Sequence, residues 1–184
     1  ARYDFDYNAM YTDLSNYTVK TYEDWFLGSY GKKAGRLFTF EGAEDIDWIT
    51  PTFETQLTEK QPYKDQTNTG TFEEVLLKKQ YIETKDCYSL NSYAAYSGGD
   101  FRLQIIENEL NKNGKKIVML RDSFACVVSP FLSLNTSELH VIDTRNFIPT
   151  ERINVYDYIK IVKPDYVIIL YNDVTRICDA QRKY

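Results

Sequence analysis

Apolar and polar segments alternate most regularly in the second half of the chain. Two short apolar runs, at 115–120 (KKIVML) and 138–143 (ELHVID), are typical of buried strands. Residues 123–135 and 154–162 are predicted helices, and in the second of them the apolar positions share one helical face. A last apolar run, at 163–171, is predicted to be a buried strand. This strand–helix–strand–helix–strand order predicts a parallel sheet with right-handed crossovers.

The first half of the chain reads as short strands and loops. Residues 17–27 and 46–51 are rich in β-branched and aromatic residues and are predicted strands. Between them, the glycine-containing segment 28–38 predicts a turn. The polar segment 59–71 predicts an exposed loop, and 72–82 fits either a helix or a strand followed by a turn.

The change of texture near residue 100 divides one predicted domain into two segments. Residues 1–99 form a β-rich segment that ends in a predicted turn at Gly98 and Gly99. Residues 100–184 form an α/β segment, which contains the regular alternation of strands and helices. The fold class predicted from the sequence is therefore α/β.

Composition and charge narrow the classes of function. The chain has 184 residues, of which 43% are hydrophobic and 27% charged, as is ordinary for a soluble globular domain. Its net charge of −5 gives no general attraction to nucleic acid or anionic lipid, and no nucleic-acid partner is predicted. The 16 tyrosines suit carbohydrate and other amphipathic ligands, although tyrosine is also favoured in strands. No apolar run approaches the roughly 18 residues of a membrane helix, so no membrane segment is predicted.

The cysteines and the first residue add two expectations. Cys87, Cys126 and Cys178 lie far apart and form no CxxC motif, so we expect neither a zinc site nor a disulfide framework. All three are predicted to be buried small side chains. No metal or other cofactor is predicted. The chain begins at Ala1 rather than Met, and we expect a processed chain or a fragment of a longer protein.

Ser123 stands directly after the predicted strand at 115–120 and before a predicted helix. This is the setting of a nucleophile elbow, in which a tight turn holds a serine hydroxyl above the edge of a sheet. The helix start would supply unpaired backbone N–H groups that stabilise an oxyanion. Serine and aspartate are also preferred N-caps, so Asp122 or Ser123 could instead only satisfy these amides. The sequence leaves both interpretations open.

Further candidate residues follow from the predicted sheet, because ligands of such sheets bind at the carboxyl ends of the strands. Those ends are predicted at residues 121–123, 143–145 and 171–173. Arg145 would bind an anionic group or orient a carbonyl at this edge. The alternative is a salt bridge of Arg145 with Asp143 or Asp122.

A nucleophilic serine needs a base, and the chain has a single histidine. His140 lies within the predicted strand at 138–143, before its carboxyl end, which favours a structural histidine that does not reach Ser123. The turn at Gly98 and Gly99 would let a backbone amide approach an oxyanion, but it is also explained as a plain turn.

The segment VMLRDSFACVVSPFLSLNTSELHVIDTRNF resembles the conserved block of the DHHW family, a branch of SGNH-like proteins related to the alginate O-acetyltransferase domains. The segments TVKTYEDWFLGSYGKKAGRLF, DIDWITPTFET and YAAYSGGDFRLQI are also similar to this family, so the resemblance covers nearly the whole chain. It implies an SGNH-like three-layer α/β fold, with a mainly parallel sheet in the second half and a β-rich first part.

The resemblance also implies roles for individual residues. The serine of the Asp-Ser-Phe motif, here Ser123, is the nucleophile that it implies. The base and its orienting carboxylate would come from an Asp-His-His-Trp motif upstream of the region that Ala1 begins, and this sequence has no such motif. The residues expected to support the site or the oxyanion are Asp122, Gly98, Gly99, Asp143 and Arg145. Without an imidazole the isolated chain should be nearly inert, since loss of triad members costs on the order of 10⁴ to 10⁶ in rate.

The function implied by the resemblance is an esterase or O-acetyltransferase that acts on O-acetyl esters of cell-envelope or extracellular glycans. Its partner would be a glycan or a small acyl ester, and its location the cell envelope or the extracellular space. The alternative is a non-catalytic glycan-binding or envelope-assembly module that keeps the fold. A receiver-like or flavodoxin-like module is disfavoured, because the chain has neither an acidic cluster with a following lysine nor a phosphate-binding glycine loop.

Overall fold

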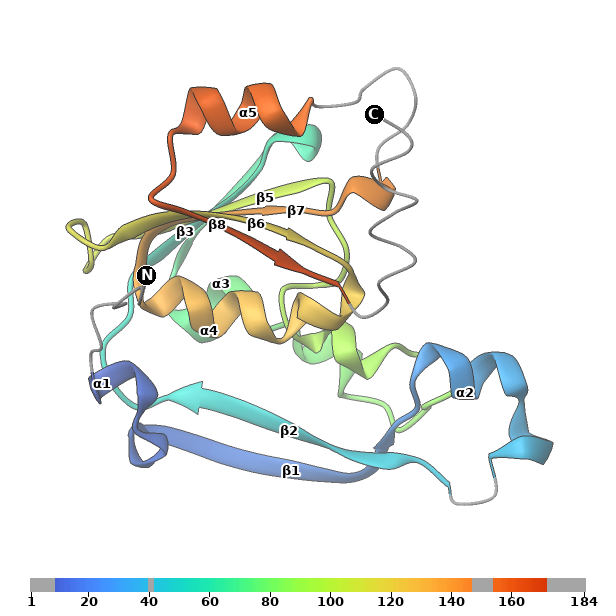
Figure 1. The fold of residues 1–184 in the computed structure, drawn as a ribbon. Helices are drawn as coiled ribbons and strands as arrows, with labels where there is room; N and C mark the ends of the chain where they lie inside the picture. Colours follow the sequence, from blue (N-terminus) through green and yellow to red (C-terminus); the bar gives the residue numbers. More distant parts are fainter. Residues whose placement is uncertain (1–8, 40–41, 147–153, 172–184) are drawn as a thin grey trace.

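A two-stranded sheet and a six-stranded sheet form the framework of the fold (Figure 1). The computed structural model describes residues 9–39, 42–146 and 154–171. The small sheet pairs β1 (Tyr17–Phe26) with β2 (Glu44–Pro51) in antiparallel fashion. Both strands were expected from their β-branched and aromatic residues.

The predicted order of strands and helices in the second half is confirmed. Its elements are β6 (Lys115–Arg121), a 3₁₀ turn (Ser123–Cys126), α4 (Val128–Leu134), β7 (Thr136–Ile142), α5 (Val155–Val162) and β8 (Tyr166–Leu170). β6 lies between β7 and β8 and is parallel to both. In Figure 1, α4 lies on one side of the large sheet and α5 on the other, so both faces are covered.

The large sheet as a whole is mixed rather than mainly parallel. Its remaining strands are β3 (Leu57–Gln61), β4 (Gln66–Gly70) and β5 (Leu103–Asn108). The strand order is β4-β3-β5-β7-β6-β8, and the ladders from β4 to β7 are antiparallel. The chain reverses between β5 and β6, so β5 cannot be parallel to the strands that follow it. The protein is therefore α/β with a mixed sheet, and parallel pairing is confined to β7, β6 and β8.

Two expectations for the first half are wrong. The segment predicted as an exposed loop, 59–71, contains part of β3 and all of β4, joined by a 3₁₀ turn (Pro62–Lys64). Its polar side chains suggested a loop, yet Glu59 is fully buried because side-chain amides bind its carboxylate. The turn expected at 28–38 holds a short helix instead, α2 (Ser29–Ala34), followed by a 3₁₀ turn (Arg36–Phe38).

The other segments of the first half are short helices and turns. The ambiguous segment 72–82 forms a helix, α3 (Phe72–Leu76), and a 3₁₀ turn (Lys79–Tyr81). Thr71 and Glu74 form a capping box at the start of α3, which explains where this helix begins. The remaining elements are α1 (Ala9–Thr12) and the 3₁₀ turns Leu14–Asn16, Ser92–Ala95 and Thr144–Asn146.

The hydrophobic core lies on both faces of the large sheet, because neighbouring residues of a strand point to opposite sides. Along β6, Ile117 and Met119 pack on the α4 side, where Leu134 of α4 joins them. Val118 packs on the other side, against residues of α5. All four side chains are buried, so β6 is a central strand of the core and its end is held in place. None of the described helices is long and apolar enough to cross a membrane.

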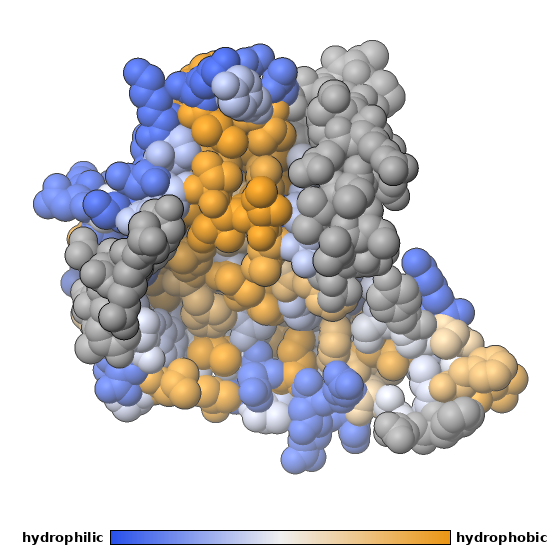
Figure 2. Space-filling view, in the orientation of Figure 1, coloured by the Kyte–Doolittle hydropathy of each residue, from blue (hydrophilic) through white to orange (hydrophobic). Residues whose placement is uncertain are grey.

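β8 differs from the buried strand that its sequence predicts. Val167 is 43% exposed and Ile169 is 56% exposed, because β8 lies at the edge of the sheet. A hydrophobic area is visible over this part of the molecule in Figure 2.

The predicted apolar face of α5 is confirmed. Its half-buried residues are Val155, Tyr158, Ile159 and Val162, and the other four residues of the helix are exposed.

Candidate functional site

The structure places Ser123 at a sharp corner between β6 and the following 3₁₀ turn. Asp122 is the N-cap of this turn, and its side chain accepts a 3.0 Å hydrogen bond from the backbone N–H of Phe124. The capping role therefore falls to Asp122, which is fully buried. Ser123 itself is partly exposed, and its hydroxyl has no hydrogen-bond partner among the described residues. The corner thus presents a free hydroxyl, and the cap does not use it.

The backbone amides near Ser123 differ in availability. Those of Phe124 and Ala125 donate to Asp122, the first to its side chain and the second to its carbonyl oxygen at 3.2 Å. The backbone N–H of Ser123 has no partner in the described part of the chain, as expected for the first residue of a helical turn. Ser123 can therefore offer both its hydroxyl and its amide at the same corner.

The turn at Gly98 and Gly99 is confirmed, and both glycines have positive φ, at 79° and 109°. The amide of Gly98 already donates to the carbonyl oxygen of Ala94 at 3.0 Å, so it is not free to bind an oxyanion. Gly99 turns its carbonyl oxygen toward the end of β6, where it accepts a 3.1 Å hydrogen bond from Arg121. The turn therefore supports β6 through a carbonyl oxygen, and the expected oxyanion role of Gly98 conflicts with this geometry.

Arg121, the last residue of β6, is completely buried. Its guanidinium donates to the carboxylate of Asp100 and, at 3.3 Å, to the carbonyl oxygen of Asp122. A further contact of 3.2 Å joins it to the sulfur of Cys126. These bonds tie the strand end, the glycine turn and the corner together. No such role of Arg121 was predicted from the sequence. The available signal was a charged residue at the end of an otherwise apolar strand.

Arg145 forms the salt bridge that was one of its two expected roles, and its partner is Asp143 rather than Asp122. Its guanidinium donates twice to the Asp143 carboxylate, at 2.9 Å and 2.6 Å, and reaches Asp100 at 3.3 Å. The hydrogen bonds to Asp143 raise the pKa of Arg145, so it stays charged. Its side chain remains 32% exposed, whereas Asp143 is buried. Part of the Arg145 side chain therefore still faces solvent.

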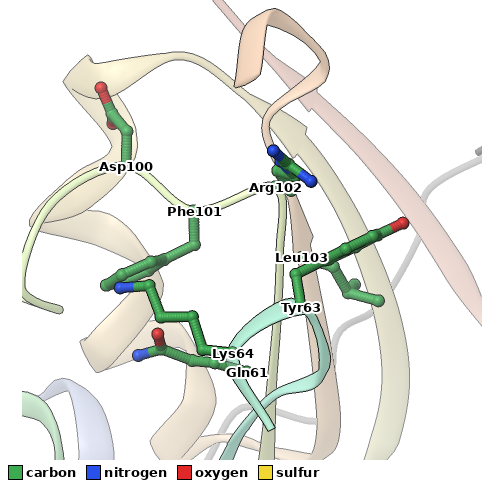
Figure 3. A pocket seen from close by; sticks show the side chains of 7 residues that line it. All are labelled: Gln61, Tyr63, Lys64, Asp100, Phe101, Arg102 and Leu103. Carbon is green, nitrogen blue, oxygen red and sulfur yellow. The ribbon is translucent and has the colours of Figure 1, made fainter. Parts of the chain in front are cut away.

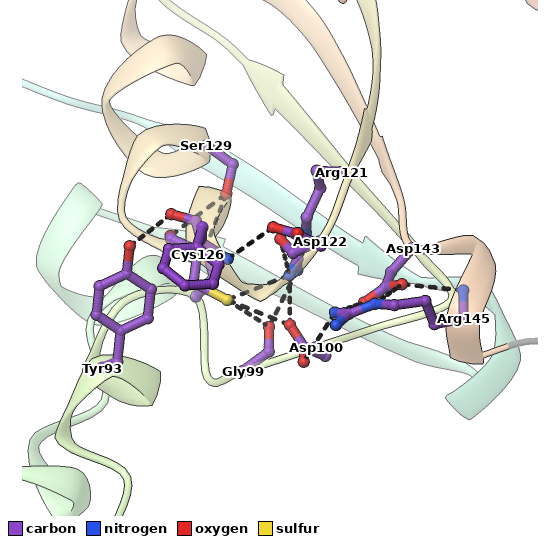
Figure 4. Close-up of polar contacts among 11 residues, drawn as sticks. Tyr93, Gly99, Asp100, Arg121, Asp122, Cys126, Ser129, Asp143 and Arg145 are labelled. Atoms are coloured by element: carbon purple, nitrogen blue, oxygen red, sulfur yellow. Dashed lines mark hydrogen bonds and ion pairs between the residues drawn. The ribbon is translucent and has the colours of Figure 1, made fainter. Parts of the chain in front are cut away.

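Asp100 lies between the two arginines and connects them (Figure 4). It belongs to the loop that follows the glycine turn, while Arg121 ends β6 and Arg145 follows β7. Three segments far apart in sequence are therefore held at one edge of the sheet. Asp100 was not among the predicted site residues, because nothing near it in the sequence indicates that it pairs with residues 21 and 45 positions away.

Cys126 contributes to this network as a buried thiol. Its sulfur lies 3.4 Å from an Asp100 carboxylate oxygen and 3.6 Å from the Gly99 carbonyl oxygen. Burial raises the pKa of the Cys126 thiol to about 12, although Arg121 opposes this shift, so it is not a thiolate nucleophile at neutral pH. Cys126 is thus buried as predicted, Cys87 is only half-buried, and Cys178 lies outside the described residues.

His140 lies on the opposite face of the sheet from the Ser123 corner, against α5. Its Nδ1 is 2.6 Å from the hydroxyl of Tyr158, and its Nε2 contacts the Glu138 carboxylate. Burial lowers the pKa of His140, and the hydrogen bond with Glu138 only partly opposes this shift. Both ring nitrogens are occupied, in agreement with a structural histidine. The chain therefore offers no imidazole to Ser123.

The third predicted strand end falls largely outside the structure. Of residues 171–173, only Tyr171 is described, and its hydroxyl lies 3.4 Å from that of Thr144. Asn172 and Asp173 lie outside the described residues. Within the described ranges, no three His, Cys, Asp or Glu side chains gather as metal ligands would.

Three solved protein structures have a fold similar to that of this chain. No family model matches the sequence, and no curated protein matches it. Bacillus cereus PatB1 with a sulfonyl adduct has a TM-score of 0.61 and 22% identity, and a second PatB1 structure has 0.60 and 21%. A DHHW family protein from Eubacterium siraeum has a TM-score of 0.62 and 20% identity.

Each of these alignments covers 86% of this chain but only 47%, 48% or 49% of the matched protein. The chain therefore spans about half the length of the structures that it matches. At this level of identity the similarity concerns the fold, and the resemblance to the DHHW family found in the sequence is confirmed as a shared fold.

Proposed function

We propose that this chain carries the nucleophilic serine of an esterase or O-acetyltransferase that acts on O-acetyl esters of cell-envelope or extracellular glycans. The observation that carries the proposal is the corner after β6, where the Ser123 hydroxyl is partly exposed and has no partner among the described residues. The fold shared with PatB1 and a DHHW family protein supports it. The proposal includes an SGNH-like three-layer arrangement and a location in the envelope or outside the cell.

The proposed chemistry is acyl transfer through a covalent intermediate. The Ser123 oxygen attacks the acetyl carbonyl while an imidazole takes the hydroxyl proton. The backbone N–H of Ser123 donates to the oxyanion. The glycan oxygen then leaves with the proton from the imidazolium, and water or an acceptor hydroxyl releases the acetyl group from the serine. Arg145, whose side chain is partly exposed, lies at the same edge of the sheet and is available to the glycan.

The imidazole in this proposal comes from outside the chain, because His140 is bound on the α5 face. The buried groups of the corner serve to position Ser123. Asp122 caps the turn, and Arg121 holds the strand end against the Gly99 carbonyl oxygen. A rigid corner of this kind keeps the hydroxyl in place before a base arrives, which is a general requirement of preorganised sites.

A labelling experiment tests the proposal on the chain itself. Sulfonyl electrophiles capture nucleophilic side chains, and one matched PatB1 structure carries a sulfonyl adduct. We expect a fluorophosphonate or sulfonyl fluoride probe to label Ser123 when free imidazole supplies the missing base. Mass spectrometry would locate the label, which Ser123→Ala should abolish. Ser137→Ala is the matched control, because Ser137 is also half-buried and lies in β7. Labelling that survives Ser123→Ala, or that never occurs with imidazole, contradicts the enzyme proposal.

The second candidate is a non-catalytic glycan-binding or envelope-assembly module. The observation that favours it is the occupied position of His140, which leaves the chain with a serine but no base. A parent gene without an Asp-x-His motif upstream of Ala1, together with glycan binding and no serine labelling, would support this alternative over the enzyme.

A further inference from the structure

A pocket lies at the same edge of the large sheet as Ser123 (Figure 3). It has a volume of about 340 Å³. β3 ends there, and β5, which is antiparallel to β3 and β7, begins there. This edge is therefore also the carboxyl end of β6 and β7. The residues that line the pocket include Gln61, Tyr63, Lys64, Phe101 and Arg102.

The pocket and the Ser123 corner share a wall. Asp100 lines the pocket and also accepts the hydrogen bond from Arg121, the residue that ends β6. In the sheet order, β5 lies two strands from β6, which corresponds to about 10 Å at the usual spacing between strands. A polymer with one unit near Ser123 could therefore place a neighbouring unit in the pocket.

A buried carboxylate fixes the orientation of the amide in the wall of the pocket. Glu59 is fully buried, and its carboxylate accepts hydrogen bonds from the side-chain amides of Gln61 at 2.8 Å, Asn68 at 3.2 Å and Gln104. A carboxylate only accepts, so both glutamines must turn their NH₂ groups toward it. Their carbonyl oxygens consequently point away from Glu59.

Those two carbonyl oxygens are buried and have no partner among the described residues. Gln61 is 5% exposed and lines the pocket, and Figure 3 shows its amide beside Lys64 and below the Phe101 ring. Gln104 is also buried but does not line the pocket. A buried acceptor without a donor costs free energy, which a ligand that donates a hydrogen bond recovers. The Gln61 oxygen is thus an oriented acceptor just beneath the surface of the pocket wall.

The rest of the lining combines aromatic rings with cations. The Lys64 ammonium lies 4.6 Å from the centre of the Phe101 ring, and the Arg102 guanidinium lies 5.2 Å from that of Tyr63. Apolar rings beside polar donors suit a ligand with apolar C–H surfaces and a rim of hydroxyl groups. The volume is near the lower end of the roughly 300–1,000 Å³ of ligand pockets, so it suits one small unit.

We propose that this pocket binds one saccharide unit of the glycan substrate, with a hydroxyl or acetamido N–H donating to the Gln61 carbonyl oxygen. This inference rests on the proposed function. In this inference, the residues at the end of β3 and the start of β5 select the glycan. The corner after β6 carries out the acyl chemistry. Lys64 and Arg102 at the rim contact the hydroxyls, or the carboxylate where the unit is a uronic acid.

The test is isothermal titration calorimetry of the chain with two probes, chitotetraose and a tetrameric galacturonate. Gln61→Met should weaken the binding of at least one probe about fivefold or more, because it removes the acceptor. Gln104→Met is the matched control. It removes the same kind of donor to Glu59 and the same kind of unpartnered oxygen, but not the pocket wall, so affinity should change less than twofold.

A second pair of variants decides the question if Gln61→Met does not fold, which its melting temperature would reveal. Lys64→Ala should weaken binding, and more for galacturonate than for chitotetraose. Lys160→Ala, which also removes an exposed lysine beside an aromatic ring, should leave affinity unchanged. Equal losses in Gln61→Met and Gln104→Met, or no binding of either probe by the unaltered chain, overturn the inference.

The two proposals fail separately. Ser123→Ala should bind saccharide as well as the unaltered chain does, since Ser123 does not line the pocket. Labelling of Ser123 without saccharide binding overturns the pocket assignment and leaves the serine proposal standing. Saccharide binding that depends on Gln61, without serine labelling, supports the pocket and favours the non-catalytic module.

Discussion

Arg121 and Glu59, two of the fully buried charged side chains, are accommodated in opposite ways. Arg121 is paired with a charged group, the carboxylate of Asp100, and with backbone carbonyl oxygens. Glu59 forms no ion pair within the described part of the chain and is held by three neutral side-chain amides. Arg121 joins the loops at the strand ends, whereas Glu59 orients amides on three neighbouring strands, β3, β4 and β5.

The different surroundings of Arg121 and Glu59 suit different functions. A charge that is matched by an opposite charge stabilises the corner that carries Ser123. The carboxylate of Glu59 is matched by amides, and the carbonyl oxygens of two of them, Gln61 and Gln104, have no partner among the described residues. Gln61 lines a pocket. The arginine cluster is therefore suited to positioning, and the glutamate cluster to recognition.

The largest effect should come from breaking the arginine cluster. Asp100→Ala leaves the buried Arg121 without its charged partner, and loss of one partner of a buried pair costs about 3–5 kcal/mol. We expect the free energy of unfolding in urea to fall by about 3 kcal/mol, at the lower end, since carbonyl oxygens still accept from Arg121. Asp157→Ala removes an exposed ion pair with Lys160 and should change stability by less than about 0.5 kcal/mol.

A smaller effect should come from the glutamate cluster. Glu59→Gln keeps the shape but introduces an NH₂ group against amides that already donate, so one donor loses its acceptor. We expect a loss of about 1–3 kcal/mol in the same urea experiment. A loss as large as that of Asp100→Ala would show that both clusters hold the fold equally, and the contrast between them would disappear.

Serine substitutions should separate structural from functional hydroxyls. Ser133 is buried and donates to the Pro130 carbonyl oxygen at 2.6 Å, so Ser133→Ala should cost about 1 kcal/mol. Ser123→Ala should change stability by less than about 0.5 kcal/mol, because its hydroxyl has no partner among the described residues. A thermal or urea comparison of the two variants measures this, and an equal cost would assign Ser123 a structural role.

The weakest expected effect concerns His140, a third buried ionisable side chain. Burial lowers its pKa in the folded chain, and the groups around it are Glu138, Tyr158, Lys116 and Glu107. The unfolded chain therefore binds this proton more tightly, so the contribution of His140 is complete above about pH 6.5 and is lost as the pH falls below it. His140→Phe should flatten stability between about pH 5 and 7. An unchanged slope in that range would contradict the assignment.

Sequence patterns were sufficient for the elements whose stability is local. The run from β6 to β8 and the corner at Ser123 follow from apolar runs and helical spacing, which depend on neighbouring residues. The β3–β4 hairpin was not predicted because its residues are mostly polar, and the burial of Glu59 among them depends in part on Gln104, 45 residues away. The exposure of β8 depends on its place in the strand order, and the pairing of Arg121 with Asp100 on the meeting of distant loops.

The open side of β8 has a practical consequence for work with this chain in isolation. Within the described residues no further strand pairs with it, so its outer backbone groups and its valine and isoleucine side chains form a ready template for another strand. Such templates drive edge-to-edge aggregation. Concentrated solutions of the chain are therefore expected to lose material to higher-order species, and a lysine at Ile169 is the simplest way to keep it dispersed.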